Sequence, residues 1–283
     1  MKKIVIGLIF DNKIGYEEKR FLKAAKKLNI ELVLFNMIDE IREEEIEEKA
    51  KKCDIIYDDC GDPITTELVK SLEILGKKVL EKGKIAYYTE DKWIFYLKCL
   101  KHKIPAPETI LLPINLDSAK KELIRFAHWP VILKRVYGTW GEFVEKADNV
   151  NEAMKIIKDF WKKGKDRLPI IAQEYVISDS YRVTIIDNKI VQTSLKKRHG
   201  WKATGVYKNT LRKFKVNKEL KKVVDKLIKI NDIGICGLDF VKKSGKWLVI
   251  EANAEPGFDA VKRERNKLIE KVLIYLKNKA KKN

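Results

Sequence analysis

Apolar runs and amphipathic segments alternate over the first hundred residues of the chain. The apolar run Lys3–Phe10 is followed by helical spacing over Tyr16–Leu28, with apolar residues recurring on one face. The alternation continues with predicted strands at Ile30–Phe35 and Asp54–Tyr57 and predicted helices at Glu40–Lys52 and Thr65–Leu75. This order predicts a parallel sheet covered by helices, whose ligands bind beyond the carboxyl ends of the strands. The turn Asp58–Pro63 follows such an end and is a candidate ligand loop, although an ordinary loop remains the simpler interpretation.

The pattern changes after the next predicted helix. Thr89 can cap this helix, and Pro105 and Pro107 end the segment and mark a boundary. Strands dominate the rest of the chain, at Thr109–Leu112, Val131–Arg135, Ile170–Val176, Tyr181–Ile186, Ile190–Leu195, Gly234–Val241 and Lys246–Glu251. Helices are expected at Leu116–Phe126, Asn151–Trp161, Lys218–Ile230 and Arg265–Leu276. The predicted fold class is therefore α/β, with α+β character in the C-terminal half.

Composition and charge exclude several classes of protein. The 283 residues hold 60 Lys and Arg against 41 Asp and Glu, a net charge of +19, and 45% are hydrophobic, which suits a globular chain of about two domains. No apolar run approaches the ~18 residues of a membrane span and no signal peptide is recognisable, so we expect a cytoplasmic protein without membrane contact. The four cysteines form no Cys-x-x-Cys pair, which argues against a disulfide framework or a zinc site. The positive charge indicates an anionic partner, or it reflects only a composition rich in Lys and Glu, as in many hyperthermophile proteins.

Three oxygen-bearing side chains occupy neighbouring positions near the end of the chain. Asp239 lies on one predicted strand, and Glu251 and Asn253 lie two residues apart at the end of the next. Side chains at i and i+2 of a strand share a face, and a hairpin at Ser244-Gly245 would bring Asp239 beside them. Two carboxylates and an amide oxygen suit Mg²⁺, with phosphates and water completing its shell. The alternative is that the carboxylates pair with nearby Lys or Arg side chains.

Two further motifs carry candidate chemistry. The buried strand Val131–Arg135 delivers Lys134, a point charge for phosphate, and the loop after it contains Gly138 and Gly141, which allow close approach of backbone N–H groups to phosphate. The segment Gln173-Glu174-Tyr175 ends another strand and could offer backbone hydrogen bonds to a purine edge. Neither motif is specific by itself, and the glycine patterns of the P-loop and of the Rossmann fold are absent.

Taken together, these segments resemble the ATP-grasp ligases, and among them the RimK-like branch. The matching pieces occur in family order: Asp91-Lys92, Leu133-Lys134, Gly138-Thr139-Trp140-Gly141, Gln173-Glu174-Tyr175, Arg182, Asp239 and Glu251-Ala252-Asn253-Ala254-Glu255-Pro256-Gly257-Phe258. The last piece is similar to the family's Glu-x-Asn-x-x-Pro-Gly block. The resemblance implies an ATP-grasp fold with an N-terminal parallel-sheet (pre-ATP-grasp) substrate domain at residues 1–88. A central lid subdomain would follow at 89–176, and a C-terminal subdomain with the metal site at 177–283.

The resemblance also implies a chemistry. ATP would phosphorylate a carboxylate to an acylphosphate, which an amine attacks to give an amide, ADP and phosphate, with ATP and Mg²⁺ or Mn²⁺ as cofactors. Asp239, Glu251 and Asn253 would bind the metal, and Arg182 and Lys202 would be the catalytic residues. The residues implied in ATP binding are Lys92, Lys134, Gly138, Thr139, Gly141, Gln173, Glu174, Tyr175, Val176 and Lys202. Ser180 and Thr204 stand where the family usually has Asp and Asn, which leaves the ribose contact and one further ligand open.

The resemblance suggests the substrates only by class. RimK-like enzymes often add glutamate, so we expect glutamate as the amine and an acidic small molecule, cofactor or protein carboxylate as the acceptor. The basic run Lys196–His199 could steer such an acceptor, or it is a solvated hairpin end. A LysX-like ligase acting on an acidic amino-group carrier protein is an alternative, and relatives often form homo-oligomers. Two other classes remain, a non-catalytic nucleotide-binding regulatory protein and a nucleic-acid-binding protein, although the aromatic residues do not alternate with the basic runs as the latter requires.

Overall fold

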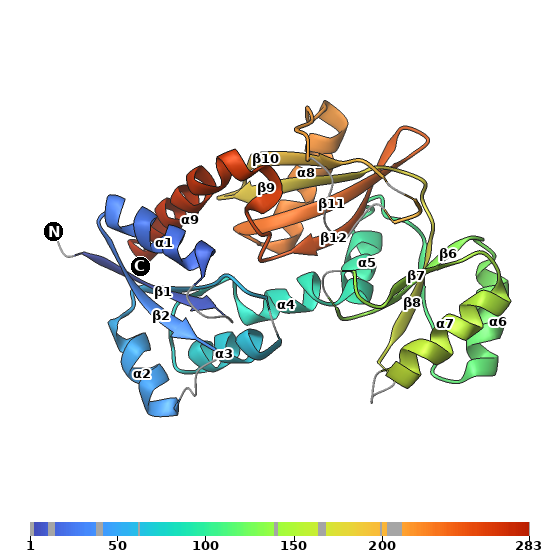
Figure 1. Cartoon of the computed structure of the whole chain (residues 1–283), viewed down its shortest axis with the longest axis horizontal. Coiled ribbons are helices and arrows are strands. Elements are labelled where there is room, and N and C mark those ends of the chain that lie inside the picture. Colours follow the sequence, from blue (N-terminus) through green and yellow to red (C-terminus); the bar gives the residue numbers. More distant parts are fainter. Residues whose placement is uncertain are drawn as a thin grey trace.

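The structure, a computed structural model, describes residues 3–10, 15–37, 42–61, 63–138, 141–163, 168–198, 200–202 and 211–282 of the chain. These residues form three four-stranded sheets arranged along the long axis of the molecule (Figure 1). The first sheet is parallel and the other two are antiparallel, which confirms the predicted fold class. No helix within these ranges is both long and apolar enough to cross a membrane.

The first sheet, in the order β2-β1-β3-β4, is built from the alternating pattern at the start of the chain. Its elements are β1 (Ile4–Phe10), α1 (Tyr16–Lys27), β2 (Ile30–Asn36), α2 (Glu43–Lys52), β3 (Ile55–Asp58), α3 (Pro63–Ile74) and β4 (Val79–Leu80). Both faces of the sheet are apolar because helices cover both. Ile6 and Leu8 pack on the side of α1, whereas Ile9 and Ile56 pack with residues of α2 and α3. The sequence pattern did not predict β4, which has only two residues.

The predicted cap of the next helix is wrong. Thr89 ends a separate short helix, α4 (Gly83–Thr89), and its hydroxyl donates to the carbonyl oxygen of Ile85 (3.2 Å). The following helix, α5 (Lys92–Lys101), is capped by Asp91, whose Oδ1 accepts a hydrogen bond from the backbone N–H of Ile94 (2.8 Å). An Asp at this position satisfies an N–H group that the helix leaves unpaired, and its charge suits the positive end of the helix.

The second sheet, in the order β5-β8-β6-β7, packs against two amphipathic helices. Its elements are β5 (Thr109–Leu111), α6 (Leu116–Phe126), β6 (Val131–Arg135), β7 (Val144–Ala147), α7 (Val150–Lys163) and β8 (Ile170–Glu174). The sequence pattern predicted every one of these except β7, which pairs antiparallel with β6. Strand β6 lies between β8 and β7, so the segment that carries Lys134 is held on both edges.

The third sheet, in the order β10-β9-β11-β12, carries most of the candidate site. Its elements are β9 (Ser180–Ile186), β10 (Lys189–Lys196), α8 (Lys218–Asn231), β11 (Ile235–Lys243) and β12 (Lys246–Asn253), followed by η1 (Asp259–Glu264) and α9 (Arg265–Ala280). Both predicted hairpins form. Asp187 and Asn188 have φ values of 53° and 59°, and Ser244 and Gly245 have φ values of 48° and 81°. Two consecutive positive φ values are typical of tight two-residue hairpin turns.

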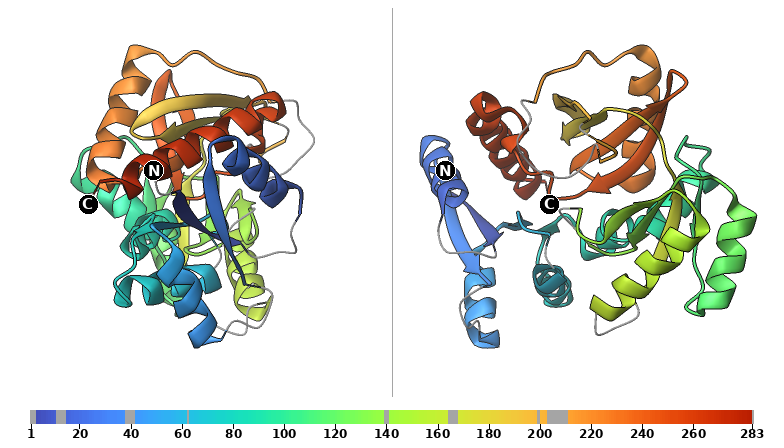
Figure 2. Two further views of the ribbon diagram at one scale, coloured as in Figure 1. Left: turned by 90° about the vertical axis from the view of Figure 1, so that its left-hand side faces the viewer. Right: turned by 45° about the vertical axis from the view of Figure 1, so that its right-hand side comes forward.

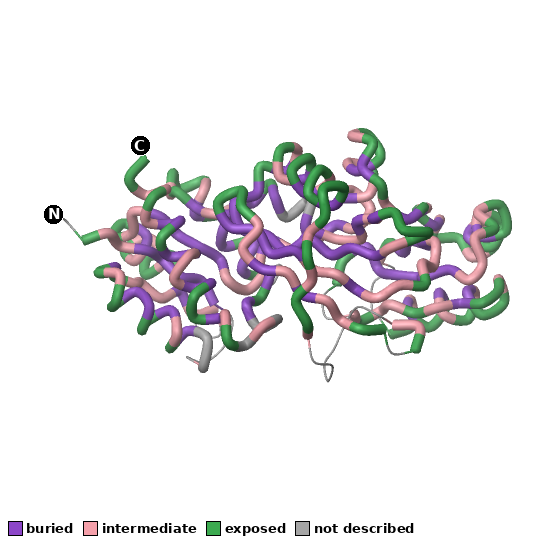
Figure 3. The backbone as a smooth tube through the Cα atoms, turned by 90° about the horizontal axis from the view of Figure 1, so that it is seen from above, coloured by how far each residue is buried: buried purple, intermediate pink, exposed green. Residues whose placement is uncertain are grey.

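The C-terminal helix α9 joins the first and third sheets. Leu268, Val272 and Leu276 of α9 belong to the same buried cluster as Ile6 of β1 and Ile235 of β11. Figure 2 shows α9 lying beside α1, and Figure 3 shows buried stretches of the backbone gathered in the interior, with exposed stretches at the margins. The same face of the third sheet therefore packs on α9 at one end and carries Asp239 toward the other. The division of the chain at residues 88 and 176 stays a prediction.

Candidate active site

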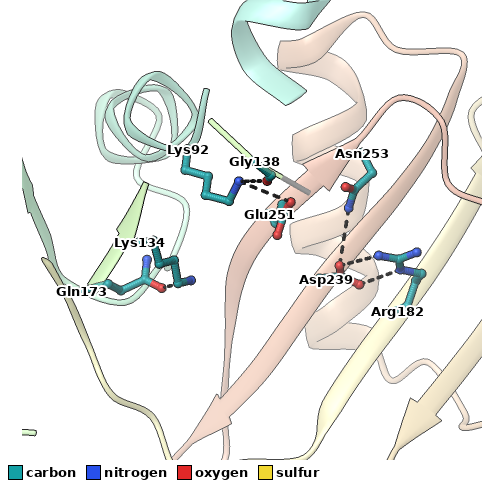
Figure 4. A network of polar contacts seen from close by, with 8 residues as sticks. All are labelled: Lys92, Lys134, Gly138, Gln173, Arg182, Asp239, Glu251 and Asn253. Carbon is teal, nitrogen blue, oxygen red and sulfur yellow. Dashed lines mark hydrogen bonds and ion pairs between the residues drawn. The ribbon is translucent and has the colours of Figure 1, made fainter. Parts of the chain in front are cut away.

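The three oxygen-bearing side chains of β11 and β12 lie on one face of the third sheet. Asp239 is directly opposite Glu251 in the antiparallel register, and Gly237 is opposite Asn253 (Figure 4). Directly opposed residues project to the same side of a sheet, and positions 251 and 253 share a face. A bulge between Asp239 and Phe240 shifts the register beyond this point. The hairpin thus brings the three side chains together as the sequence predicted.

Asp239 is also engaged by Arg182 of the neighbouring strand β9. Nε and Nη2 of Arg182 donate to the two carboxylate oxygens of Asp239, at 2.8 and 2.7 Å, and Nη1 donates to the carbonyl oxygen of Pro256 (2.9 Å). Nδ2 of Asn253 lies 3.4 Å from Oδ2 of Asp239. The attraction of Asp239 raises the pKa of Arg182, which keeps its charge. The structure therefore contains the ion pair that the sequence left open as the alternative use of Asp239.

Lys92 approaches the same face from the first turn of α5. Its Nζ lies 3.9 Å from Oε1 of Glu251 and donates to the carbonyl oxygen of Gly138 (2.7 Å) in the loop after β6 (Figure 4). Lys202 holds the far side of that loop, because its Nζ donates to the carbonyl oxygens of Gly141 (2.9 Å) and Val144 (3.4 Å). Two of the lysines expected at phosphate thus flank the glycine-containing loop. Thr139, the remaining predicted residue of this loop, lies outside the described residues.

Lys134 is buried on β6, and its ammonium group donates to Oε1 of Gln173 on β8 (2.8 Å). Nε2 of Gln173 in turn donates to the hydroxyl of Thr109 (2.9 Å), which fixes the orientation of the amide. Burial lowers the pKa of Lys134 to about 8, against the attraction of Glu251 and Asp239. The side chain of Gln173, which the sequence assigned to nucleotide binding, thus contacts Lys134 and orients it.

The other residues expected at the purine lie where β8 ends. Oε1 of Glu174 accepts a hydrogen bond from Nζ of Lys243, which ties the second sheet to the hairpin of the third. The hydroxyl of Tyr175 donates to the carbonyl oxygen of Trp201 (3.1 Å). Val176 follows as a half-buried residue of the connection to β9. The side chain of Glu174 is thus used in an ion pair, and the backbone N–H groups of Glu174 and Tyr175 donate to the carbonyl oxygens of Glu108 (2.8 Å) and Pro130 (3.3 Å). The backbone carbonyl groups are then the part of this segment suited to a purine edge.

A small pocket, open to solvent, lies where the first sheet meets the end of β12. It is lined by Asp58, Thr66, Val69, Glu81, Lys82, Gly83, Ile85, Thr89, Glu90, Ala254 and Glu255. Asp58 is the start of the candidate loop after β3, whereas neither Glu81 nor Glu255 was among the predicted site residues. The acidic neighbours and burial together raise the pKa of Glu255 well above its ordinary value. The signals in the sequence are that Glu255 stands within the block from Glu251 to Phe258 and follows Asn253 with strand spacing.

Comparison with known proteins decides the family. The RimK-like ATP-grasp domain matches residues 89–276, about two thirds of the chain. The chain belongs to the RimK-like ATP-grasp family. Its relatives include the coenzyme gamma-F420-2:alpha-L-glutamate ligase of Methanocaldococcus jannaschii, 26% identical over 221 residues that cover 72% of this chain and 74% of that protein. Members of this family are ADP-forming carbon–nitrogen ligases.

Solved structures show the same fold over nearly the whole length of this RimK-like protein. A RimK domain ATP-grasp protein from Sphaerobacter thermophilus superposes with a TM-score of 0.77 at 15% identity, covering 96% of this chain and 98% of that one. The D-alanine–D-alanine ligase of Bacillus anthracis, complexed with ATP, superposes with a TM-score of 0.74 at 17% identity, covering 98% of this chain and 97% of that one. The likeness of fold to these proteins therefore includes the first sheet as well as the two antiparallel sheets.

The donor set of this RimK-like protein fits Mg²⁺ in its chemistry. Asp239, Glu251 and Asn253 offer hard oxygen ligands on one face, which Mg²⁺ prefers. Within the described ranges, no three His, Cys, Asp or Glu residues are grouped so as to hold a metal ion by themselves. Mg²⁺ commonly takes one or two protein carboxylates and completes its shell with substrate phosphates and water, so such a site is formed by protein and nucleotide together.

Proposed function

We propose that this RimK-like ATP-grasp protein joins a carboxylate to an amine through an acylphosphate, with glutamate as the amine. The acceptor is an acidic small molecule, cofactor or protein carboxyl group. One observation supports this above all: the ammonium groups of Lys92 and Lys134 face the carboxylates of Asp239 and Glu251 between the second and third sheets (Figure 4). Phosphoryl transfer needs little beyond positioning and charge neutralisation, and this arrangement supplies both signs of charge.

Lys134 and Lys92 attract the triphosphate in this proposal. Gln173 holds Lys134 by a 2.8 Å hydrogen bond, so the ammonium group is oriented before the nucleotide arrives. A bound polyphosphate favours the charged form of this lysine and raises its pKa from the value that burial imposes. Gly138 and Gly141 allow the loop backbone to approach phosphate oxygens, and the backbone carbonyl groups of Glu174 and Tyr175, with the backbone of Val176, bind the purine. Mg²⁺, when bound by Asp239, Glu251 and Asn253, supplies charge neutralisation at the phosphates.

Arg182 acts on the acyl side of the reaction, and Lys202, beside the glycine-containing loop, contacts phosphate. Arg182 keeps its charge beside Asp239 and is held by the carbonyl oxygen of Pro256, so its guanidinium is fixed at the edge of the site. A fixed cation at this place stabilises the negative charge of an acylphosphate and of its transition state. The acidic acceptor approaches along the basic run at the end of β10, where Lys196, Lys197 and Arg198 attract carboxylates, and away from the carboxyl-lined pocket.

The test is nucleotide turnover with defined products. Purified protein is incubated with ATP, Mg²⁺, L-glutamate and a metabolite extract, and mass spectrometry follows the gain of one glutamyl unit. We expect ADP and phosphate to form together with the new amide. Glu251→Gln should abolish turnover, whereas Asp225→Asn, which removes an exposed carboxylate of α8, should leave it unchanged. Formation of AMP and pyrophosphate, or equal turnover by Glu251→Gln, would contradict the proposal.

A further inference from the structure

Glu81 links the end of the first sheet to the start of strand β11. Its side chain is 7% exposed, and Oε1 accepts hydrogen bonds from the backbone N–H groups of Gly234 (2.9 Å) and Ile235 (2.7 Å). These donors lie more than 150 positions further along the chain. Glu81 is therefore a tether between parts of the chain that are remote in sequence.

The hydrogen bonds of Glu81 take the place of strand pairing at the start of β11. Strand β12 pairs with β11 only from Gly237 onward, so it offers no acceptors to the first residues of β11. Glu81 supplies them from outside the sheet. Strand β9 holds the other edge of this segment, where Ile235 pairs with Ile186. The start of β11 is thus fixed between β9 and the carboxylate of Glu81.

This position bears on the candidate site in two ways. β11 carries Asp239, four residues beyond Ile235, and a strand is stiff over such a length. Glu81 also lines the pocket that ends at Ala254 and Glu255, directly after Asn253. The carboxylate of Glu81 therefore contacts β11, the strand that carries the proposed metal ligand Asp239, and also lines the pocket beside β12.

The position is costly for a carboxylate. Burial disfavours its charge, Asp232 adds repulsion, and Lys279 compensates only in part. An apolar side chain would fill the same space without this cost but could not accept the two hydrogen bonds. The geometry therefore favours a role for the acceptor oxygen itself.

We propose that Glu81 is a positioning residue of the active site, which holds β11, and with it Asp239, in register for binding the metal–nucleotide complex. This inference rests on the proposed function, because it assumes that Asp239 contributes to metal binding. Glu81 contacts neither metal nor nucleotide and acts through the backbone of Gly234 and Ile235.

The experiment compares four proteins: wild type, Glu81→Ala, Glu81→Gln and Asp54→Ala. Asp54 is the matched control, because its Oδ2 also accepts a backbone N–H from a distant residue, Val5 (2.8 Å), but within the first sheet. Calorimetry measures binding of the ATP analogue AMPPNP with Mg²⁺ and with EDTA. Hydrogen exchange measures protection of the Gly234 and Ile235 amides.

We expect Glu81→Ala to weaken Mg²⁺-dependent binding by about tenfold, which corresponds to ~1.4 kcal/mol, and to leave binding in EDTA unchanged. The same variant should speed exchange of the two amides. Glu81→Gln keeps an acceptor oxygen and should restore both properties, and Asp54→Ala should change neither. Equal Mg²⁺-dependent binding by wild type and Glu81→Ala, or an equal loss in Asp54→Ala, would overturn the inference alone. Absence of Mg²⁺-dependent binding in the wild type would instead contradict the proposed function.

Discussion

Removing Arg182 should destabilise the protein more than removing Asp239. The two charges are joined by hydrogen bonds of 2.7 and 2.8 Å, but the side chain of Asp239 is 9% exposed and that of Arg182 is 32% exposed. Breaking a fully buried pair costs about 3–5 kcal/mol, and an exposed pair contributes about 0–1 kcal/mol. Arg182→Ala leaves the more buried charge without its partner, so we expect a loss of about 2–3 kcal/mol. Asp239→Ala leaves a charge that reaches water, so we expect about 1–2 kcal/mol.

Urea unfolding of the two single variants and of the double variant measures these values and the coupling between them. The coupling energy should be about 1–2 kcal/mol, and the slope with urea should not change. Lys221→Ala is the control, because it breaks an exposed pair with Asp225 on α8 and should cost less than about 0.5 kcal/mol. Mg²⁺ should recover stability in Arg182→Ala, because the unpaired carboxylate then has a cation. A greater loss in Asp239→Ala than in Arg182→Ala would refute the reasoning.

Three further outcomes follow from buried groups. Burial lowers the pKa of Lys134 to about 8, so nucleotide affinity measured by calorimetry should fall as the pH rises through that value, and Lys134→Arg should remove this fall. Burial raises the pKa of Glu81 from 4.5 to about 7, so the folded protein holds its proton longer than the unfolded chain. The free energy of unfolding should therefore fall by about 3 kcal/mol as the pH rises from 4.5 to 7, and urea titrations of Glu81→Gln should lack this fall. Phe258 is 1% exposed, so Phe258→Ala should lose about 3–5 kcal/mol in urea unfolding, whereas Ile74→Ala at an 87% exposed position should lose less than about 0.5 kcal/mol.

Local periodicity was sufficient to predict most elements and the face that carries Asp239. Strand alternation and the turn at Ser244-Gly245 fix which residues oppose each other, so Asp239 and Glu251 could be placed together without coordinates. The two-residue strand β4 is too short for a period to appear, and β7 has no apolar run because Glu145 and Lys146 occupy its centre. They exist because neighbouring strands supply hydrogen-bond partners.

Partners that are distant in sequence could not be predicted in the same way. The candidate residues Arg182, Gln173 and Lys202 were assigned to ligands, and the structure gives each a protein partner as well. No sequence pattern distinguished Glu81, because its hydrogen-bond donors are backbone N–H groups in a segment that lies far along the chain. The sequence indicates what each candidate side chain can bind, whereas three-dimensional packing decides whether its partner is a ligand or another protein group.

The place of α9 has a consequence for the order in which the chain folds during synthesis. Helix α9 covers the apolar residues of β1 and β3, yet it is synthesised after all the other described helices and strands. Until then, Ile6, Leu8 and Tyr57 lack a large part of their apolar cover, and the nascent first sheet depends on other protection from aggregation. The second sheet, with α6 and α7 close by in sequence, can complete its core while the chain is still growing. The first sheet therefore completes its core only after α9 has been synthesised.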